Sequence, residues 1–319
     1  MNTIPLIFDE KQINISLIEN KMRTEKKFNI TAVLLSTSAL TFHAHILDTL
    51  SHIGFSDVIS LELSPSRISS EDVAKKFPFV KFIMPLEKAT IGEMVNIACR
   101  ESEGEAFLVL RDTLSIAPNF LPTNLANTLL KKNKFCITPR LVDAEKNPVA
   151  MQMNPIAERG KFRVHPSTRV QDEMNTLYPF DYIGLYNKKK FMSLAGFDYT
   201  IVSPYYQNLD LSLRAWLWGE EIIVSTPLLF SYAKEAPIED VSSDTTYLHF
   251  YLKNLAPKYK IDKGAFIPCL SFLNFLKHSS CGFFESKREF SDARKWVKTN
   301  SARFCTDLEH LIQNWKTLV

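Results

Sequence analysis

Two short polar segments hold the residues best suited to chemistry, and the first is QNLDLSLR, residues 207–214. It carries a single acid, Asp210, which is followed four residues later by Arg214. On a helix this spacing puts the carboxylate and the guanidinium on one face, where they form either an exposed ion pair or part of a site. Asn208 suits a helix cap, and Asp210 suits the positive end of the helix dipole. A capped structural helix and a ligand site therefore both remain open.

The second polar segment is the triplet Arg111, Asp112 and Thr113, which follows the apolar run AFLVL. Such a run predicts a buried strand, and ligands of open α/β sheets bind at the carboxyl ends of strands. Arg111 is therefore expected either to pair with a neighbouring acid or to bind a diphosphate through two hydrogen bonds of its guanidinium. One carboxylate beside a cation is a poor site for a hard divalent metal, because such metals need several oxygen ligands.

Composition and missing motifs argue against several functional classes. The 319 residues are 45% hydrophobic and 23% charged with a net charge of +3, which is typical of a globular protein and gives no basis for nucleic-acid binding. The sequence contains no GxGxxG, P-loop or CxxC motif, and its five scattered cysteines indicate reduced thiols. His43 and His45 would point about 200° apart on a helix, which argues against a metal pair. No apolar run approaches the roughly 18 residues of a membrane helix, so we expect a cytoplasmic protein without a transmembrane segment.

The elements that must position these segments alternate between strands and helices. Apolar runs predict strands at residues 29–36, 57–63, 80–84, 105–110 and 135–142. Helical periodicity predicts helices between them at residues 40–53, 69–77, 90–102 and 118–132. This alternation predicts an α/β fold with a mostly parallel sheet flanked by helices.

The chain divides into three predicted parts. Residues 1–28 form an N-terminal arm, in which TIPLIF and INISLI are expected to pair as a β-hairpin. Residues 29–235 form the α/β domain, and residues 236–319 form a helical C-terminal extension with aromatic residues at helical spacing. Within the domain, residues 143–180 are polar and irregular, which is typical of a functional or mobile connection such as a lid.

Two longer motifs resemble family-2 glycosyltransferases with the Rossmann-like GT-A fold. The segment NIACRESEGEAFLVLRDTLSIAPNFL is similar to the centre of that family, where a strand ends in an acidic DxD-like triplet that holds a divalent cation under the diphosphate of a sugar nucleotide. The segment FMSLAGFDYTIVSPYYQNLDLSLRAWLWGEEIIVSTP is similar to the acceptor side, where GGFDE is followed by ED-x-DLSLR. The resemblance covers residues 29–235 and implies a GT-A-like domain there.

The sequence departs from the family pattern at the acids. The DxD-like triplet falls on RDT, residues 111–113, so both outer acids are missing. The family's acidic pair falls on Gln207 and Asn208, and the second position usually holds the catalytic base. Neither amide can accept a proton at neutral pH. Glu62 in SLELS matches the family's acid that contacts the nucleotide's base or ribose.

The resemblance implies a glycosyltransferase that moves a sugar from a nucleotide-sugar donor, with a UDP-sugar the first choice, to a hydroxyl of a glycan or protein acceptor. The alternative is an inactive relative that binds a nucleotide, a glycan or a partner protein, and a homo-oligomer is left open. The predicted catalytic positions are Asp210 as the best remaining base, Asp198 as the second, and Asn208 at the family's base position. The predicted donor-binding residues are Glu62, Arg111, Asp112, Thr113 and Arg214. The missing acids argue against a divalent metal, for which Asp112 would be the ligand if a cation binds.

Overall fold

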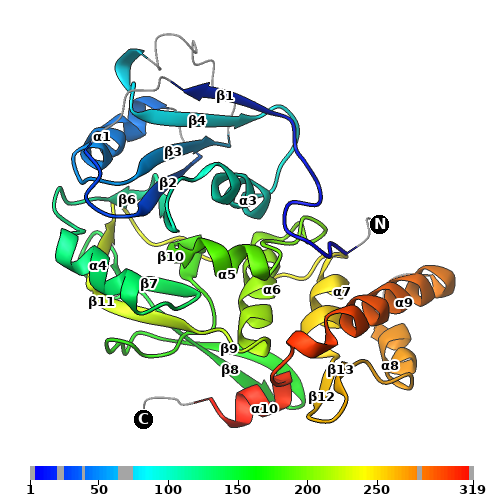
Figure 1. Cartoon of the computed structure of the whole chain (residues 1–319). Helices are drawn as coiled ribbons and strands as arrows, with labels where there is room; N and C mark the ends of the chain where they lie inside the picture. The colour runs from blue at the N-terminus through cyan, green and yellow to red at the C-terminus, as the bar shows by residue number, and fades with distance from the viewer. Residues whose placement is uncertain (1–3, 20–24, 38–39, 64–74, 279–281, 316–319) are drawn as a thin grey trace.

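A nine-stranded sheet forms the centre of the described part of the molecule (Figure 1). The computed structural model describes residues 4–19, 25–37, 40–63, 75–278 and 282–315. The strand order is β1-β4-β3-β2-β5-β10-β7-β11-β6. Strands β2, β3, β4, β5, β7 and β11 run in one direction, whereas β1, β6 and β10 run in the other. The predicted α/β fold with a mostly parallel sheet is confirmed.

The bounds of the elements follow the predicted alternation. The strands of the sheet are β1 (Ile15–Glu19), β2 (Ile30–Ser36), β3 (Asp57–Glu62), β4 (Val80–Pro85), β5 (Ala106–Arg111), β6 (Leu114–Ser115), β7 (Cys136–Val142), β10 (Gly184–Asn187) and β11 (Ile222–Tyr232). The helices among them are α1 (Leu40–Ser51), α3 (Ile91–Glu101), α4 (Thr123–Lys131), α5 (Lys188–Ser193) and α6 (Pro204–Leu217). The helix predicted at 69–77 falls mostly outside the described residues.

Strands β2 and β5 lie side by side in the middle of the sheet. The runs ITAVLLS in β2 and AFLVL in β5 are buried at every position, as in parallel strands covered by helices on both faces. Leu35 pairs with Arg111 and Ser36 pairs with Glu62, so the carboxyl ends of β2, β3 and β5 meet at one edge. The strand order also reverses here, because β3 and β4 continue on one side of β2 and β5 lies on the other. In open α/β sheets such a reversal marks the crevice in which ligands bind.

The N-terminal segment joins the sheet and does not form the predicted hairpin. Strand β1 pairs antiparallel with β4, from Ile15 opposite Pro85 to Glu19 opposite Lys81, while residues 4–8 form no strand. The hairpin prediction is wrong because an isolated two-stranded ribbon is marginally stable, and β4 offers an open edge of the sheet instead. The boundary of the arm at residue 28 stays a prediction.

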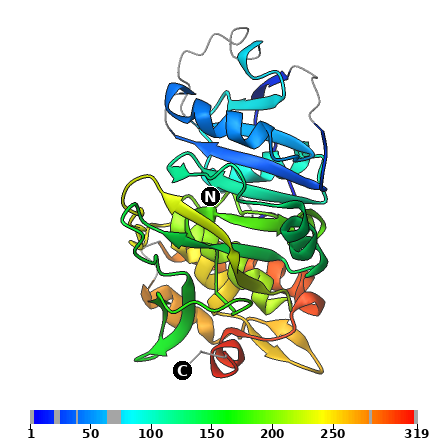
Figure 2. The same cartoon turned by 90° about the vertical axis from the view of Figure 1, so that its left-hand side faces the viewer.

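The connection at residues 143–180 is more regular than its composition suggests. Strands β8 (Gln152–Glu158) and β9 (Lys161–Ser167) form an antiparallel ribbon. Both views place this ribbon beside α10 (Leu308–Gln313), at the end of the molecule opposite β1 (Figure 1, Figure 2). A short 3-10 helix, η1 (Phe180–Tyr182), then leads into β10. The role of this connection as a lid stays a prediction.

The chain after β11 is mainly helical, as predicted. It forms α7 (Tyr247–Phe250), a π-helix (Tyr251–Leu255), α8 (Ser271–His278), α9 (Phe283–Thr299), the 3-10 helix η3 (Ser301–Arg303) and α10, together with a small ribbon of β12 (Lys258–Lys260) and β13 (Gly264–Phe266). The helix α7 and the π-helix pack against α6, and α9 packs against the π-helix. Trp296 Nε1 on α9 donates a hydrogen bond to Pro5 O at 2.9 Å, so the segment before β1 lies against this region. Among the described helices, none combines the length and the apolar character that a membrane crossing requires.

Candidate functional site

Asp112 organises the loop that follows β2. Its Oδ2 accepts hydrogen bonds from Thr37 N at 2.8 Å and from Ser36 Oγ at 3.4 Å. Thr113 is exposed at the same edge of the sheet. The structure therefore brings two of the predicted donor-binding residues to the carboxyl ends of β2 and β5, and Asp112 contributes there by holding backbone.

Glu62 lies at the end of β3 but its carboxylate is buried, with 1% of its surface exposed. Ser60 Oγ donates to Glu62 Oε1 at 2.6 Å, and His43 Nε2 lies 3.3 Å from the same oxygen. A ligand at this edge would meet the residues around Glu62 before it met the carboxylate. The predicted contact to a base or ribose stays a prediction.

Arg111 at the end of β5 forms an ion pair with Asp181 of η1. The distance from Arg111 Nε to Asp181 Oδ2 is 3.3 Å, and the two side chains are only 11% and 14% exposed. Burial raises the pKa of Asp181, and the nearby Arg111 partly offsets that rise. Arg111 Nη1 is buried and has no hydrogen-bond partner in the part of the chain that the structure describes. An unpaired guanidinium nitrogen of this kind is suited to an anionic ligand.

The turn that carries Asp181 is conformationally unusual. Asp181 has φ 51° and Tyr182 has φ 65°, and both values lie in the left-handed region that residues other than glycine rarely adopt. Asn208 Nδ2 donates to Pro179 O at 2.7 Å, and Tyr182 Oη donates to Pro204 O at 2.7 Å. The side chain at the family's base position therefore supports the turn that pairs with Arg111.

A cavity of about 200 Å³ lies between this turn and the segment that follows β11; we call it the Glu239 cavity. Its lining residues are Ile91, Asp181, Tyr182, Pro204, Tyr205, Pro237, Ile238, Glu239 and Asp240. Tyr178 Oη donates to Glu239 Oε2 at 2.6 Å. Burial raises the pKa of Glu239 to about 7, the charge of Asp181 adds to the rise, and the hydrogen bond from Tyr178 opposes it. Two carboxylates whose pKa values are raised therefore line one cavity beside Arg111.

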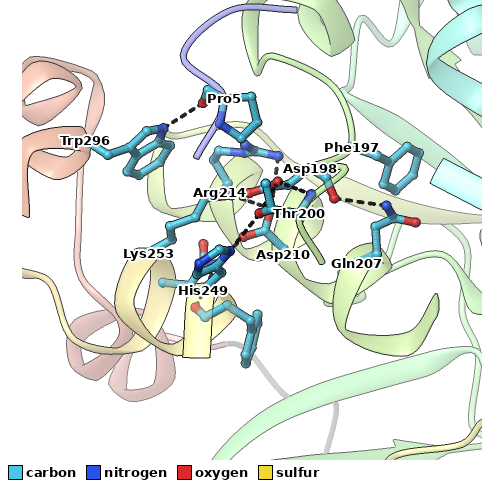
Figure 3. Close-up of polar contacts among 12 residues, drawn as sticks. Pro5, Phe197, Asp198, Thr200, Gln207, Asp210, Arg214, His249, Lys253 and Trp296 are labelled. Carbon is cyan, nitrogen blue, oxygen red and sulfur yellow. Dashed lines mark hydrogen bonds and ion pairs between the residues drawn. The ribbon is translucent and has the colours of Figure 1, made fainter. Parts of the chain in front are cut away.

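Asp198, Asp210 and Arg214 lie elsewhere, in a buried charged network (Figure 3). Lys253 Nζ of the π-helix lies 2.7 Å from Asp198 Oδ2 and 2.9 Å from Asp210 Oδ2, and none of these three side chains is exposed. Arg214 Nη2 lies 3.2 Å from Asp210 Oδ2 and donates to Gly196 O at 2.7 Å. The geometry favours a structural role for the network, and the predicted roles of Asp210 and Asp198 as bases and of Arg214 in donor binding stay untested.

A buried histidine extends this network toward α9. Thr200 Oγ1 donates to Asp198 Oδ1 at 2.6 Å and lies 2.8 Å from His249 Nδ1 (Figure 3). His249 Nε2 lies 2.6 Å from Glu289 Oε2. Burial raises the pKa of Asp198, but Lys253 and Thr200 outweigh it, so this pKa lies below its usual value. The network thus holds the C-terminal helices against α6 through charges.

Gln207 is also held internally. Its Oε1 accepts from Gly92 N at 2.9 Å, and its Nε2 donates to Thr90 Oγ1 and to Asp198 O, each at 2.9 Å. These bonds join the start of α6 to the start of α3. Gln207 is therefore held through both polar atoms of its amide, and among the described residues Asn208 is held through Nδ2 alone.

Sequence reasoning missed Asp181, Tyr178 and Glu239. The signal for the first two lies in YPFDY, residues 178–182, where an acid sits among aromatic residues inside a polar connection. Glu239 in APIED carries no pattern of its own, because its pKa is raised by burial in the folded chain and its hydrogen-bond donor, Tyr178, lies 61 positions earlier.

The ligand chemistry at this edge does not fit a divalent metal. No group of three or more His, Cys, Asp or Glu side chains arranged to hold a metal ion occurs among the described residues. Asp112 is occupied by Thr37 N, and Arg111 stands beside it. Hard cations prefer several carboxylate or carbonyl oxygens, so no step of the chemistry below uses a metal.

No protein-family profile matches the sequence, and no curated protein sequence matches it. Among solved structures, GalNAc-T7 with UDP, GalNAc and Mn²⁺ is similar with a TM-score of 0.59 and 10% identity over 90% of this chain. This chain covers 56% of the GalNAc-T7 chain, about half of its length.

Two further solved structures are more distant. Residues 1–349 of TarS from S. aureus are similar with a TM-score of 0.48 and 12% identity, over 85% of this chain and 72% of that one. The mannosyltransferase PcManGT from Pyrobaculum calidifontis, in complex with GDP-Man and Mn²⁺, is similar with a TM-score of 0.45 and 8% identity. That similarity covers 95% of this chain and 82% of the PcManGT chain. Sequence identities this low indicate a shared fold and nothing more, and the assignment of the fold rests on the similarity to GalNAc-T7. The chain therefore has the GT-A fold of nucleotide-sugar glycosyltransferases, and its C-terminal part is mainly helical.

Proposed function

We propose that this protein is a glycosyltransferase that binds a nucleotide sugar at the carboxyl ends of β2, β3 and β5. The observation that carries the proposal is Arg111, whose buried Nη1 has no hydrogen-bond partner in the described residues while its Nε pairs with Asp181. A buried donor without an acceptor is costly, and an oxygen of a diphosphate would remove that cost. Since GalNAc-T7 was crystallised with UDP, a UDP-sugar is the first choice of donor.

The reaction would be an in-line displacement at the sugar's anomeric carbon. An acceptor hydroxyl of a glycan or protein attacks, and the bond to the diphosphate breaks. Negative charge then develops on the leaving diphosphate, where the fixed guanidinium of Arg111 would stabilise it. Asp112 would act through the backbone of the loop at Thr37, which it holds at 2.8 Å, and the exposed Thr113 would offer its hydroxyl.

A second candidate is a protein that keeps the donor site without transfer. Both amides of the family's acidic pair, Gln207 and Asn208, are held by internal hydrogen bonds, and neither can take a proton. Asp198 and Asp210 are fully buried against Lys253, which favours a structural role for both. This candidate shares the nucleotide site with the first and differs in turnover.

Titration calorimetry tests the donor site directly. The titrants are UDP, UDP-GalNAc, UDP-GlcNAc and GDP-Man, each with EDTA or with Mn²⁺. We expect binding to persist in EDTA, and Arg111→Ala to weaken it by roughly 10- to 150-fold, because a hydrogen bond to a charged group contributes about 1.5–3 kcal/mol.

The matched control is Arg294→Ala, which removes an exposed guanidinium from α9 and should leave affinity unchanged. Absence of binding by every nucleotide, with or without Mn²⁺, contradicts the donor site. Binding that EDTA abolishes contradicts the assignment of Arg111 in place of a metal.

A further inference from the structure

The Glu239 cavity lies next to the proposed donor site and has one face suited to a sugar ring. Asp181, the partner of Arg111, lines the cavity together with Glu239, so one volume of about 200 Å³ touches both carboxylates. Ile91, Pro204 and Tyr205 supply apolar and aromatic surface on its wall. This volume is below the roughly 300–1,000 Å³ of sites for drug-sized ligands and suits a single ring.

The carboxyl group of Glu239 is oriented by a hydrogen bond from Tyr178. Tyr178 Oη donates to Oε2 at 2.6 Å, which orients the carboxyl group and leaves Oε1 for another partner. No salt bridge to Glu239 occurs among the described residues. The titratable groups that face it are Tyr178, Asp181, Tyr182, Tyr205 and Tyr232, with Asp240 on the same cavity wall. Burial raises its pKa to about 7, which is where a general base is most effective at neutral pH.

Asp181 and the two predicted bases, Asp198 and Asp210, are engaged with cations. Asp181 pairs with Arg111 at 3.3 Å. Asp198 and Asp210 pair with Lys253 and have no exposed surface. Asp240 also lines the cavity without an ion pair among the described residues, but it is exposed and hydrogen bonds from Ser242 N and Oγ lower its pKa. Glu239 is therefore the acid on the cavity wall that is largely buried, has no cationic partner in the described part of the chain and has a raised pKa.

We propose that Glu239 is the general base of the transfer and that the Glu239 cavity binds the acceptor as a pyranoside, its ring against Tyr205. In this step the hydroxyl proton of the acceptor moves to the Glu239 carboxylate, and the acceptor oxygen forms the new bond to the anomeric carbon. The bond from that carbon to the diphosphate breaks, and its electron pair leaves with the diphosphate toward Arg111. The inference rests on the proposed function, and it assigns the role that Asn208 cannot perform.

The cavity wall has the two kinds of surface that a sugar acceptor requires. Aromatic rings pack against the C–H faces of pyranosides while a carboxylate accepts a hydroxyl, and the cavity offers both kinds of surface. Tyr205 is uncharged at neutral pH at its usual pKa of about 10, and burial raises that pKa further.

The test measures release of UDP from UDP-GalNAc and UDP-GlcNAc, with p-nitrophenyl glycosides of glucose, galactose, GlcNAc and GalNAc as acceptor probes. In the wild type we expect kcat to rise with pH through a midpoint near 7. Glu239→Gln keeps the shape and the Tyr178 contact, so donor affinity should stay within about twofold while kcat falls by roughly 100-fold or more. Tyr178→Phe removes a hydrogen bond that lowers the pKa of Glu239, so the midpoint should move to higher pH.

The control is Glu235→Gln, which changes an exposed carboxylate on the segment that follows β11 and should leave kcat and the midpoint of its pH dependence unchanged. Equal turnover in Glu239→Gln and the wild type overturns the base assignment while the donor site stands. Donor binding without UDP release in any mixture, water included, overturns transfer and base together. Loss of donor binding in the wild type overturns the proposed function itself, and calorimetry separates that result from the other two.

Discussion

Replacing Lys253 by methionine tests whether charge holds the C-terminal helices against α6. Its Nζ lies 2.7 Å from Asp198 Oδ2 and 2.9 Å from Asp210 Oδ2, with all three side chains fully buried. Methionine keeps most of the volume but leaves two buried carboxylates, and among the described residues only Asp210 keeps a cation, Arg214. Removing one partner of a buried ion pair costs about 3–5 kcal/mol, so we expect the free energy of unfolding to fall by that amount.

Urea denaturation followed by circular dichroism at pH 7 measures this loss. The control is Lys258→Met, because Lys258 pairs with Glu309 where the side chains are 48% and 61% exposed, and exposed pairs contribute only about 0–1 kcal/mol. In the wild type, the stability from Asp198 is lost only as the pH falls below its usual value of 3.8, since its pKa is lowered. In the variant Lys253 no longer offsets burial, so the pKa of Asp198 rises and this loss of stability at low pH should shrink or reverse. A Lys253→Met protein as stable as Lys258→Met would refute the reasoning.

Three further outcomes follow from the burial of single groups. Burial raises the pKa of Glu239 from 4.5 to about 7, so the free energy of unfolding of the wild type should fall by up to roughly 3 kcal/mol relative to Glu239→Gln as the pH rises from about 4.5 to 8. Urea unfolding across that range measures the difference, and parallel stability curves for the two proteins would contradict the burial of Glu239. Asn208→Asp removes the donor to Pro179 O, so it should destabilise the fold by about 1–3 kcal/mol, which thermal unfolding measures. The same variant should show no metal-dependent turnover, which UDP release with Mn²⁺ checks. Iodoacetamide at pH 8 should label the exposed Cys305 and spare Cys99, because burial raises the pKa of Cys99 to about 12. Peptide mass spectrometry after labelling of the folded protein measures both sites, and equal labelling would exclude a closed core around Cys99.

The pattern of apolar residues along the sequence was sufficient to predict the central sheet. Runs such as ITAVLLS and AFLVL are too apolar for a surface strand, so alternation with helices left a parallel sheet as the consistent arrangement. The same logic placed Arg111 at the carboxyl end of a central strand, and its pairing with a neighbouring acid is confirmed. The acid itself, Asp181, was out of reach because it comes from a turn 70 positions later in the chain.

Residues 207–214 show where local pattern fails. The spacing of Asp210 and Arg214 correctly predicts an ion pair, but the pair is buried and not exposed, because Lys253 arrives from a distant π-helix. The capping role expected of Asn208 is wrong: α6 begins earlier, with Ser203 as its cap and Pro204 in its first turn. Asn208 then lies inside the helix, where its amide is directed at Pro179 O. Charge burial and side-chain direction depend on tertiary neighbours that spacing does not encode.

The hydrogen bond from Trp296 to Pro5 has a consequence for synthesis of the chain, since its partners are 291 positions apart. The ribosome makes the N-terminal segment first and α9 much later. At about 5–20 residues per second, Pro5 waits about 15–60 s before Trp296 exists. During that interval Ile4, which is 3% exposed in the finished fold, lacks the surface that α9 provides nearby. β1 and β4 can pair early, and Asp9 and Lys11 can pair with Arg100 and Glu93 of α3, but the bond to Pro5 O forms only after α9 emerges. That bond therefore forms late in the assembly of the fold, and before then the stretch around Ile4 is a candidate for chaperone binding.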